Sequence, residues 1–321
     1  MDILKEISQQ VSSIKKVDNS TYLDSIFTHI DRAEFYYLQG KTDTNYFNDV
    51  IYRSNQAYEG ALKESYKVLA DKSQEEVIKQ TPNDIEIFFE KNNIFRERVL
   101  QLFKNYRQEW RNKSTHDYKL FFDENEAFMA MTSVTSFVHL LLKQIQEKIA
   151  FNTQQKKLEE EKEIIENIKT IAISKDKLVA DKLVEIIIEF SKQNSQHIFE
   201  NTQNISETEI MGLFHAYIES AGETIMAERE PKLAFGVKNL RPDFLIAIDK
   251  EPIILEFKRT KSKITFTEND INQVITYLTL TNTYSGVLYY ANFNEPNPKP
   301  EISKTEVILN DKKYEIITII T

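Results

Sequence analysis

The sequence predicts a multidomain α+β protein, with an all-α bundle over residues 1–150, a helical connector over 151–205 and an α/β domain over 206–321. Three observations lead to this division. A chain of 321 residues is long enough for about two domains. Apolar residues recur at spacings of three and four through the first 190 residues, which is the period of one helix face. After residue 206, short apolar runs alternate with turn residues, which is typical of strands.

Composition excludes several classes of function. The chain has no cysteine, which excludes disulfides, cysteine-ligated metals and a cysteine nucleophile. Hydrophobic residues make up 41% of the chain, with 20 Phe and 15 Tyr, which is enough for packed cores. The formal net charge of −9 excludes a strongly basic surface for nucleic acid. No signal-like start and no run of about 18 apolar residues occurs, so we expect a soluble, cytoplasmic protein without a membrane segment.

The N-terminal domain is predicted to contain helices, each with one apolar stripe. These helices cover about 3–14, 47–69, 82–106 and 123–145. The last of them begins at Asp123, and Glu126 three residues later gives a start that resembles a capping box. The connector is expected to hold a charged helix, then an amphipathic helix, and then a polar linker at 191–206.

The C-terminal domain is predicted to combine helices with short strands. Its elements are expected at 207–225 and from 267 onward for the helices, and at 243–248, 253–258, 285–291, 306–309 and 314–320 for the strands. The first two strands are separated only by turn-forming residues, so we expect them to pair as a hairpin. This pattern predicts an α/β domain.

Charged residues in the predicted hairpin form the most informative pattern of the sequence. If Asp249 and Lys250 make a two-residue turn, Asp243 lies directly opposite Glu256. Two facing carboxylates repel each other unless a cation lies between them, and Mg²⁺ is the hard, oxygen-preferring ion that suits such a pair. Lys258 shares the face of Glu256, because residues two apart in a strand point the same way, and it can orient or deprotonate a water molecule there. These are the parts that metal-assisted phosphodiester hydrolysis requires.

The same residues resemble a known family signature. Pro242 and Asp243, followed by Glu256 and Lys258, are similar to the motif of the PD-(D/E)XK nuclease superfamily, which has the restriction-endonuclease-like fold. The resemblance spans about 207–291. It implies a nuclease that uses Mg²⁺, with Mn²⁺ as an alternative ion, and whose metal ligands are Asp243, Glu256 and the carbonyl of Phe257.

Two further features of that superfamily have counterparts in the predicted helices. Gln273 and Tyr277 lie four residues apart on one helix face and match the QxxxY element of its exonuclease-like and defence-associated branches. The superfamily also places an acidic residue on the helix before the hairpin. Glu209 is the first choice for this position, Glu207 the second and Glu228 the third.

A second resemblance occurs at the end of the predicted 82–106 helix. Arg111, Asn112 and His116 match the Arg-x4-His motif of HEPN domains, which are small helical bundles in many prokaryotic nucleases and toxins. This resemblance implies RNA cleavage without metal at the interface of a homodimer, with His in acid–base chemistry and Arg on the phosphate. The structural alternative is that Arg and His simply stabilise the helix end.

Together these patterns predict a metal-dependent nuclease that acts on nucleic acid, with DNA favoured over RNA, in prokaryotic antiviral defence. The chain is expected to form a homodimer through its N-terminal domain. Two alternatives remain: a metal-independent HEPN-type RNase toxin, and a non-catalytic regulator that binds nucleic acid or a partner protein. Dependence of cleavage on metal separates the first two functions, and binding without any cleavage identifies the third.

Overall fold

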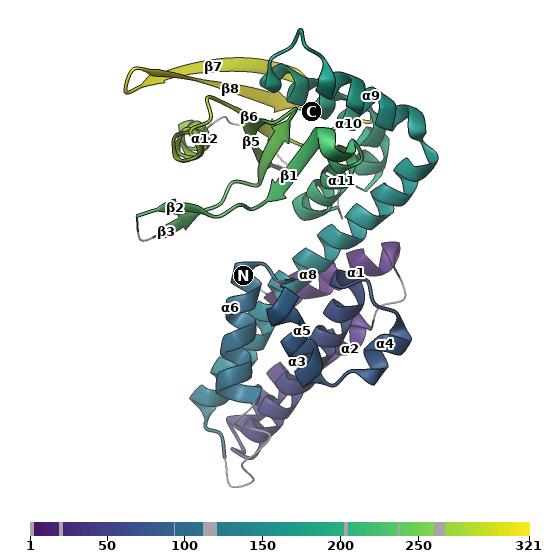
Figure 1. The fold of residues 1–321 in the computed structure, drawn as a ribbon. Coiled ribbons are helices and arrows are strands. Elements are labelled where there is room, and N and C mark those ends of the chain that lie inside the picture. Colours follow the sequence, from purple (N-terminus) through teal and green to yellow (C-terminus); the bar gives the residue numbers. More distant parts are fainter. Residues whose placement is uncertain are drawn as a thin grey trace. The chain divides into compact units, whose positions relative to one another are not determined.

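The computed structural model describes residues 3–18, 22–92, 94–111, 121–201, 205–236, 238–259 and 267–321 (Figure 1). The chain divides into two compact units, Met1–Ile149 and Ala150–Thr321. The first unit is helical in its described part, and the second combines helices with a six-stranded sheet, so the predicted α+β character is confirmed.

Helices form the first unit. They are α1 (Ile3–Val17), α2 (Leu23–Gly40), α3 (Tyr46–Leu69), α4 (Gln74–Lys79), α5 (Pro82–Asn92), α6 (Glu97–Tyr106), the π-helical turn η1 (Arg107–Arg111) and the start of α8 (Glu124–Glu160). The predicted capping box is confirmed, since Asp123 N donates to Glu126 Oε2 at 3.0 Å and Glu126 N donates to Asp123 Oδ1 at 2.9 Å.

The sequence prediction missed the short helix α4 and was wrong at two further places in this unit. It missed α2, although Leu23, Ile26 and Ile30 already repeat at helical spacing. It also joined α5 and α6 into one helix. The chain breaks between them because Phe95 is inserted into the aromatic core, with its ring centroid 4.3 Å from that of Phe89.

The second unit contains the sheet. Its elements are α9 (Lys162–Ile173), α10 (Val179–Glu200), α11 (Glu207–Glu219), the 3₁₀ turn η2 (Gly222–Thr224), β1 (Ile225–Arg229), β2 (Leu233–Phe235), β3 (Lys238–Leu240), β4 (Phe244–Ile248), β5 (Glu251–Lys258), α12 (Glu268–Thr281), β6 (Ser285–Tyr290), β7 (Glu301–Leu309) and β8 (Lys312–Ile320). The main sheet has the order β1-β4-β5-β6-β8-β7, and β2 pairs with β3 in a separate hairpin. Strands β5, β6 and β8 run parallel, and the other pairs are antiparallel.

The two faces of the sheet are covered by different helices, with α12 on one side and α10 and α11 on the other (Figure 1). Alternate residues of β5 separate accordingly. Leu255 and Phe257 belong to the core that contains α10 and α11, whereas Ile254 belongs to the core of α12. The long antiparallel strands β7 and β8 form one edge of the sheet.

Residues 191–206, predicted as a polar linker, mostly continue α10, which ends only at Glu200. Three polar side chains of this stretch, Ser191, Asn194 and Ser195, face the core, whereas Lys192, Gln196 and His197 are exposed. Ser191 is buried, bonds to the Ile187 carbonyl at 2.8 Å and lies 2.9 Å from the hydroxyl of Tyr289 on β6. The expected connector is thus part of the sheet-containing unit.

Membrane-spanning potential is limited to one segment of the described chain. Helix α8 is long and apolar enough to cross a bilayer by length and composition, but half of its most apolar window is buried inside the protein. A core helix of a soluble protein has these same properties.

Gly286 on β6 allows α12 to approach the sheet. A Cβ at this position would lie 2.9 Å from Val274 Cγ1 and 3.3 Å from Leu278 Cδ2, which is closer than ordinary packing permits. We predict that Gly286→Ala lowers the free energy of unfolding by about 1–3 kcal/mol, the usual range for overpacking a core. Urea denaturation measures this change.

The compensating variant is Val274→Ala. In the double variant it removes the methyl group that the new Cβ would strike, so we expect the two substitutions to be strongly non-additive. Additive effects would contradict the role of Gly286 as the contact point of α12.

Candidate active site at the ends of β4 and β5

The β4–β5 hairpin has the predicted turn and register. Asp249 and Lys250 both have positive φ, at 51° and 71°, as the type I′ turn of a two-residue hairpin requires. The ladder runs from Ile248 opposite Glu251 to Phe244 opposite Leu255. The next positions along the two strands are Asp243 and Glu256.

The carboxylates of this hairpin lie on the face that α12 covers. Glu256 and Lys258 alternate with Phe257, whose side chain is buried in the opposite core. Asp243 is followed by Phe244, which also belongs to that opposite core. The sheet therefore brings Asp243, Glu256 and Lys258 together on one surface.

Backbone hydrogen bonds hold the two carboxylates in place. Phe257 N donates to Asp243 Oδ2 at 2.8 Å, and Asp243 N donates to Glu256 Oε2 at 3.3 Å. Arg229 on β1 donates to the carbonyl of Asp243, and its guanidinium lies 4.3 Å from the ring centroid of Phe244. In a strand, the N–H and C=O of one residue point toward the same neighbour, so the Phe257 carbonyl faces the Asp243 side.

Burial makes this pair electrostatically unusual. Glu256 is only 4% exposed. Its burial, and then the nearby charge of Asp243, raise its pKa to about 7, although Lys258 opposes the shift. Burial also raises the pKa of Asp243, against the opposing effects of the Phe257 N–H and Arg229. Perturbed carboxylates of this kind are more frequent at functional sites than elsewhere.

Lys258 and the α12 side chains complete a hydrogen-bond network around Glu256. Lys258 Nζ donates to Glu256 Oε1 at 2.8 Å and to Gln273 Oε1 at 3.3 Å. Gln273 Nε2 donates to Glu256 Oε1 and to the Tyr277 hydroxyl, both at 2.8 Å. The Tyr277 hydroxyl in turn donates to the Arg241 carbonyl at 3.2 Å. Gln273 and Tyr277 therefore face the carboxylates.

The charge of Lys258 follows from the same contacts. Its burial alone would lower the pKa of its ammonium group, but the adjacent Glu256 carboxylate, its hydrogen bond and the charge of Asp243 raise that pKa overall. Its side chain retains 28% exposure, so the ammonium group borders solvent while the Glu256 side chain is 5% exposed.

On the helix before the hairpin, α11, Glu207, the second choice, bonds to the backbone directly after Lys258. Glu207 Oε2 accepts a hydrogen bond from Arg259 N at 2.7 Å, and burial, followed by the charge of Asp243, raises its pKa. The Glu209 carboxylate turns back instead and accepts a hydrogen bond from Ser206 N at 2.7 Å, which closes a capping box. Glu228, the third choice, is exposed on β1.

The site offers oxygen atoms of the kind that bind a divalent metal ion, but its described side chains do not form a complete set of ligands. No group of three or more His, Asp or Glu side chains is gathered closely enough to hold a metal within the described ranges. Asp243 and Glu256 nevertheless supply carboxylate oxygens beside the Phe257 carbonyl, the donor type that Mg²⁺ and Mn²⁺ prefer. A divalent cation would also offset the repulsion that raises the pKa of Glu256.

Of the Arg111, Asn112 and His116 motif, only Arg111 lies within the described residues. It ends the π-helical turn η1, and its charge acts on the buried carboxyl of Glu86. Glu86 Oε2 also lies 3.9 Å from Arg107 Nη1, and Glu86 Oε1 accepts a hydrogen bond from the Tyr58 hydroxyl at 3.4 Å. The charge of Arg111 thus acts on groups inside the helical unit, Glu86 and Tyr58.

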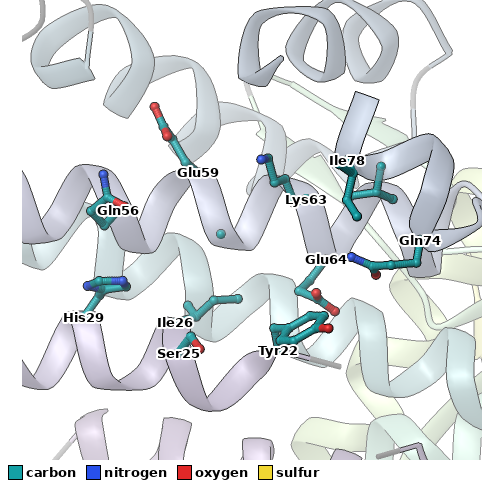
Figure 2. A pocket seen from close by; sticks show the side chains of 12 residues that line it. Tyr22, Ser25, Ile26, His29, Gln56, Glu59, Lys63, Glu64, Gln74 and Ile78 are labelled. Atoms are coloured by element: carbon teal, nitrogen blue, oxygen red, sulfur yellow. The ribbon is translucent and has the colours of Figure 1, made fainter. Parts of the chain in front are cut away.

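A separate cavity of about 300 Å³ lies in the first unit, between α2, α3 and α4 (Figure 2). Glu64 extends from α3 toward Tyr22 at one end of it (Figure 2). The Glu64 side chain is 4% exposed and accepts a hydrogen bond from the backbone of Tyr22, but its Oε2 has no hydrogen-bond partner in the described structure. This burial raises the pKa of Glu64.

Comparison with protein-family models, curated proteins and solved structures gave no match to this chain. The interpretation of the site therefore depends on its own geometry and on the motif resemblance.

Glu64 provides a test of buried charge in the helical unit. Because its pKa is higher in the folded chain than in the unfolded chain, its ionisation destabilises the fold as pH rises through the folded-state pKa. Glu64→Gln keeps an acceptor for Tyr22 N without ionising. We predict that this variant is more stable than the wild type at pH 7–8, and that the difference disappears below the ordinary pKa of Glu, about 4.

Urea denaturation at several pH values measures this difference. Glu59→Gln is the matched control, because Glu59 lines the same cavity from the same helix but is only partly buried. A Glu64→Gln effect that is constant with pH would show that packing, rather than charge, causes it.

Proposed function

We propose that the C-terminal unit hydrolyses phosphodiester bonds of nucleic acid, DNA foremost, with Mg²⁺ or Mn²⁺. One observation carries this proposal: Asp243 and Glu256 are held side by side, Glu256 is buried, and Lys258 and Gln273 bond to Glu256. A purely structural hairpin gains nothing from a buried carboxylate beside a second, partly buried one, because their repulsion destabilises the fold.

The proposed roles follow from the contacts of each side chain. A bound divalent ion would polarise the scissile phosphate and offset the charge that develops on its oxygens. Asp243, Glu256 and the Phe257 carbonyl would hold that ion. Lys258 has three N–H donors, of which Glu256 and Gln273 engage two, and we assign the third to the attacking water or the phosphate.

Gln273 and Tyr277 act as positioning residues in this proposal. Gln273 contacts both Glu256 and Lys258, so it fixes the separation of the carboxylate and the ammonium group. Tyr277 holds Gln273 against the backbone of Arg241. By the same family resemblance we assign the activity to prokaryotic defence, and we place it in the cytoplasm, as the sequence leads us to expect.

Lys258→Ala tests the chemistry directly. Removing the ammonium group should lower kcat for Mg²⁺-dependent DNA cleavage by a factor of about 10²–10³, the usual effect of losing one stabilising charge. Cleavage of plasmid and linear DNA with Mg²⁺ or with EDTA measures this loss. Lys299→Ala is the matched control, since Lys299 is exposed in a loop. Undiminished cleavage by Lys258→Ala would remove the activity from this site.

Asp243→Asn tests ion binding without reference to activity. Without metal, the variant should melt at a higher temperature than the wild type, because one of the two opposed charges is gone. Mg²⁺ or Mn²⁺ should raise the melting temperature of the wild type and have little effect on the variant. Differential scanning calorimetry gives both values, and an equal metal response in the two proteins would contradict the assignment of Asp243 as a ligand.

Tyr277→Phe tests the positioning of Gln273. The change removes only the hydroxyl that links Gln273 to the Arg241 carbonyl, so we expect kcat to fall about tenfold and the unfolding free energy to fall by about 1 kcal/mol. Tyr284→Phe is the control, because that ring is 54% exposed. Loss of stability with full cleavage would show that the hydroxyl serves the fold alone.

A further inference from the structure

The β2–β3 hairpin, Leu233–Phe235 paired with Lys238–Leu240, is separate from the six-stranded sheet. It is inserted between β1 and β4, directly before Pro242 and Asp243. Figure 1 shows it extending away from the sheet on the side of α12. The hairpin is referred to below as the arm.

The base of the arm is anchored to the helix that carries Gln273. Leu233 and Leu240, which face each other across the arm, pack against the apolar cluster of α12. The Tyr277 hydroxyl bonds to the Arg241 carbonyl at the end of the arm. The arm and the two carboxylates are therefore held by the same helix.

The outer part of the arm presents an aromatic ring to solvent. Phe235 has the same side-chain direction as Leu233, because the two are separated by one residue in a strand. Unlike Leu233, it is 52% exposed. Gly236 follows in the left-handed conformation, with φ of 59° and no atom beyond its chain neighbours within 4 Å of the position of a Cβ.

The charge of the arm contrasts with that of the whole chain. Its strands and their flanking residues, 231–241, contain three basic residues and no acidic residue, whereas the chain as a whole has a net charge of −9. Lys232 is exposed at the start of the arm and Arg241 is partly exposed at its end. A local basic segment with an exposed aromatic ring suits nucleic acid, since cations attract phosphates and aromatic faces stack on bases.

We propose that the arm binds the DNA substrate beside the scissile bond, with Phe235 stacked on an unpaired base and Lys232 and Arg241 near the adjacent phosphates. This inference rests on the proposed function and specifies its substrate class. Bases in an intact duplex are already stacked on their neighbours, whereas unpaired bases expose their faces. The preferred substrate is therefore DNA with a junction between double-stranded and single-stranded segments.

The test measures binding of a DNA duplex with a single-stranded overhang and of the same duplex with blunt ends. Ca²⁺ replaces Mg²⁺, and a gel verifies that the DNA stays intact. Loss of one base-stacking contact in Phe235→Ala should raise the Kd for the overhang duplex about tenfold and leave the Kd for the blunt duplex nearly unchanged. Met226→Ala is the matched control, because Met226 is 61% exposed on β1 of the same unit. Equal affinities of Phe235→Ala and wild type for the overhang would overturn the proposal.

A fluorescence measurement locates the contact. Trp110 is the only Trp of the chain, so Phe235→Trp in a Trp110→Phe background places a single reporter on the arm. Stacking should quench this reporter when the overhang duplex is added. An unchanged signal with DNA would overturn the proposal and leave a protein partner as the occupant of the arm.

These measurements separate failure of the arm from failure of the proposed function. Phe235-dependent DNA binding without any Mg²⁺-dependent cleavage would support the arm and refute the nuclease activity. Mg²⁺-dependent cleavage that Phe235→Ala leaves unchanged, together with unchanged binding, would refute the arm and support the nuclease activity.

Discussion

The opposition of two carboxylates across β4 and β5 is the constraint on which the C-terminal unit depends. Asp243 and Glu256 face each other because the two-residue turn sets a register that places them opposite each other, one position beyond the last ladder pair. Burial then strengthens their repulsion, since charges interact more strongly where water is excluded. The surrounding donors compensate in part: Lys258 and Gln273 bond to Glu256, and the Phe257 N–H bonds to Asp243. The end of strand β5 thus carries charged residues, Glu256 and Lys258, whose burial is compensated by hydrogen bonds to each other and to their neighbours.

Packing of α12 against the sheet determines whether that group can form. Gly286 leaves room for Val274, and this close approach brings Gln273 within 2.8 Å of Glu256. Tyr277 then connects the helix to the backbone of Arg241, directly before Pro242. Helix α12 therefore contacts three parts of the unit: the apolar core on one face of the sheet, the polar network around Glu256 and the β2–β3 hairpin. Val274, which packs at Gly286, and Gln273, which bonds to Glu256, are adjacent residues of α12, so the core contact and the polar network share one turn of this helix.

The sequence was sufficient for the features that depend on local rules. Turn residues and the period of two determine the register that pairs Asp243 with Glu256, and helical spacing places Gln273 and Tyr277 on one face. The sequence was insufficient where tertiary contacts determine the local structure. The segment that begins at Ser191 was predicted as a linker because it is polar. It is helical instead, and the hydroxyl of Ser191 is buried against that of Tyr289, a contact that the sequence does not reveal. Ser206, three residues before Glu209, is a capping-box signal, and the Glu209 carboxylate accepts a hydrogen bond from Ser206 N as that signal predicts. Strands as short as β2 and β3 carry too little pattern to be recognised.

The acidity of the chain shapes how such a site could act on a polyanion. With a net charge of −9, long-range attraction cannot bring nucleic acid to the protein, so affinity must come from short-range contacts. Cations close to Asp243 are already committed to the protein: Arg229 binds its carbonyl, and Lys258 binds Glu256. Divalent metal would supply the positive charge that the protein lacks at this position, and base stacking adds affinity that is independent of charge. An exposed aromatic ring on a basic hairpin next to paired carboxylates would give an acidic protein such short-range contacts with DNA.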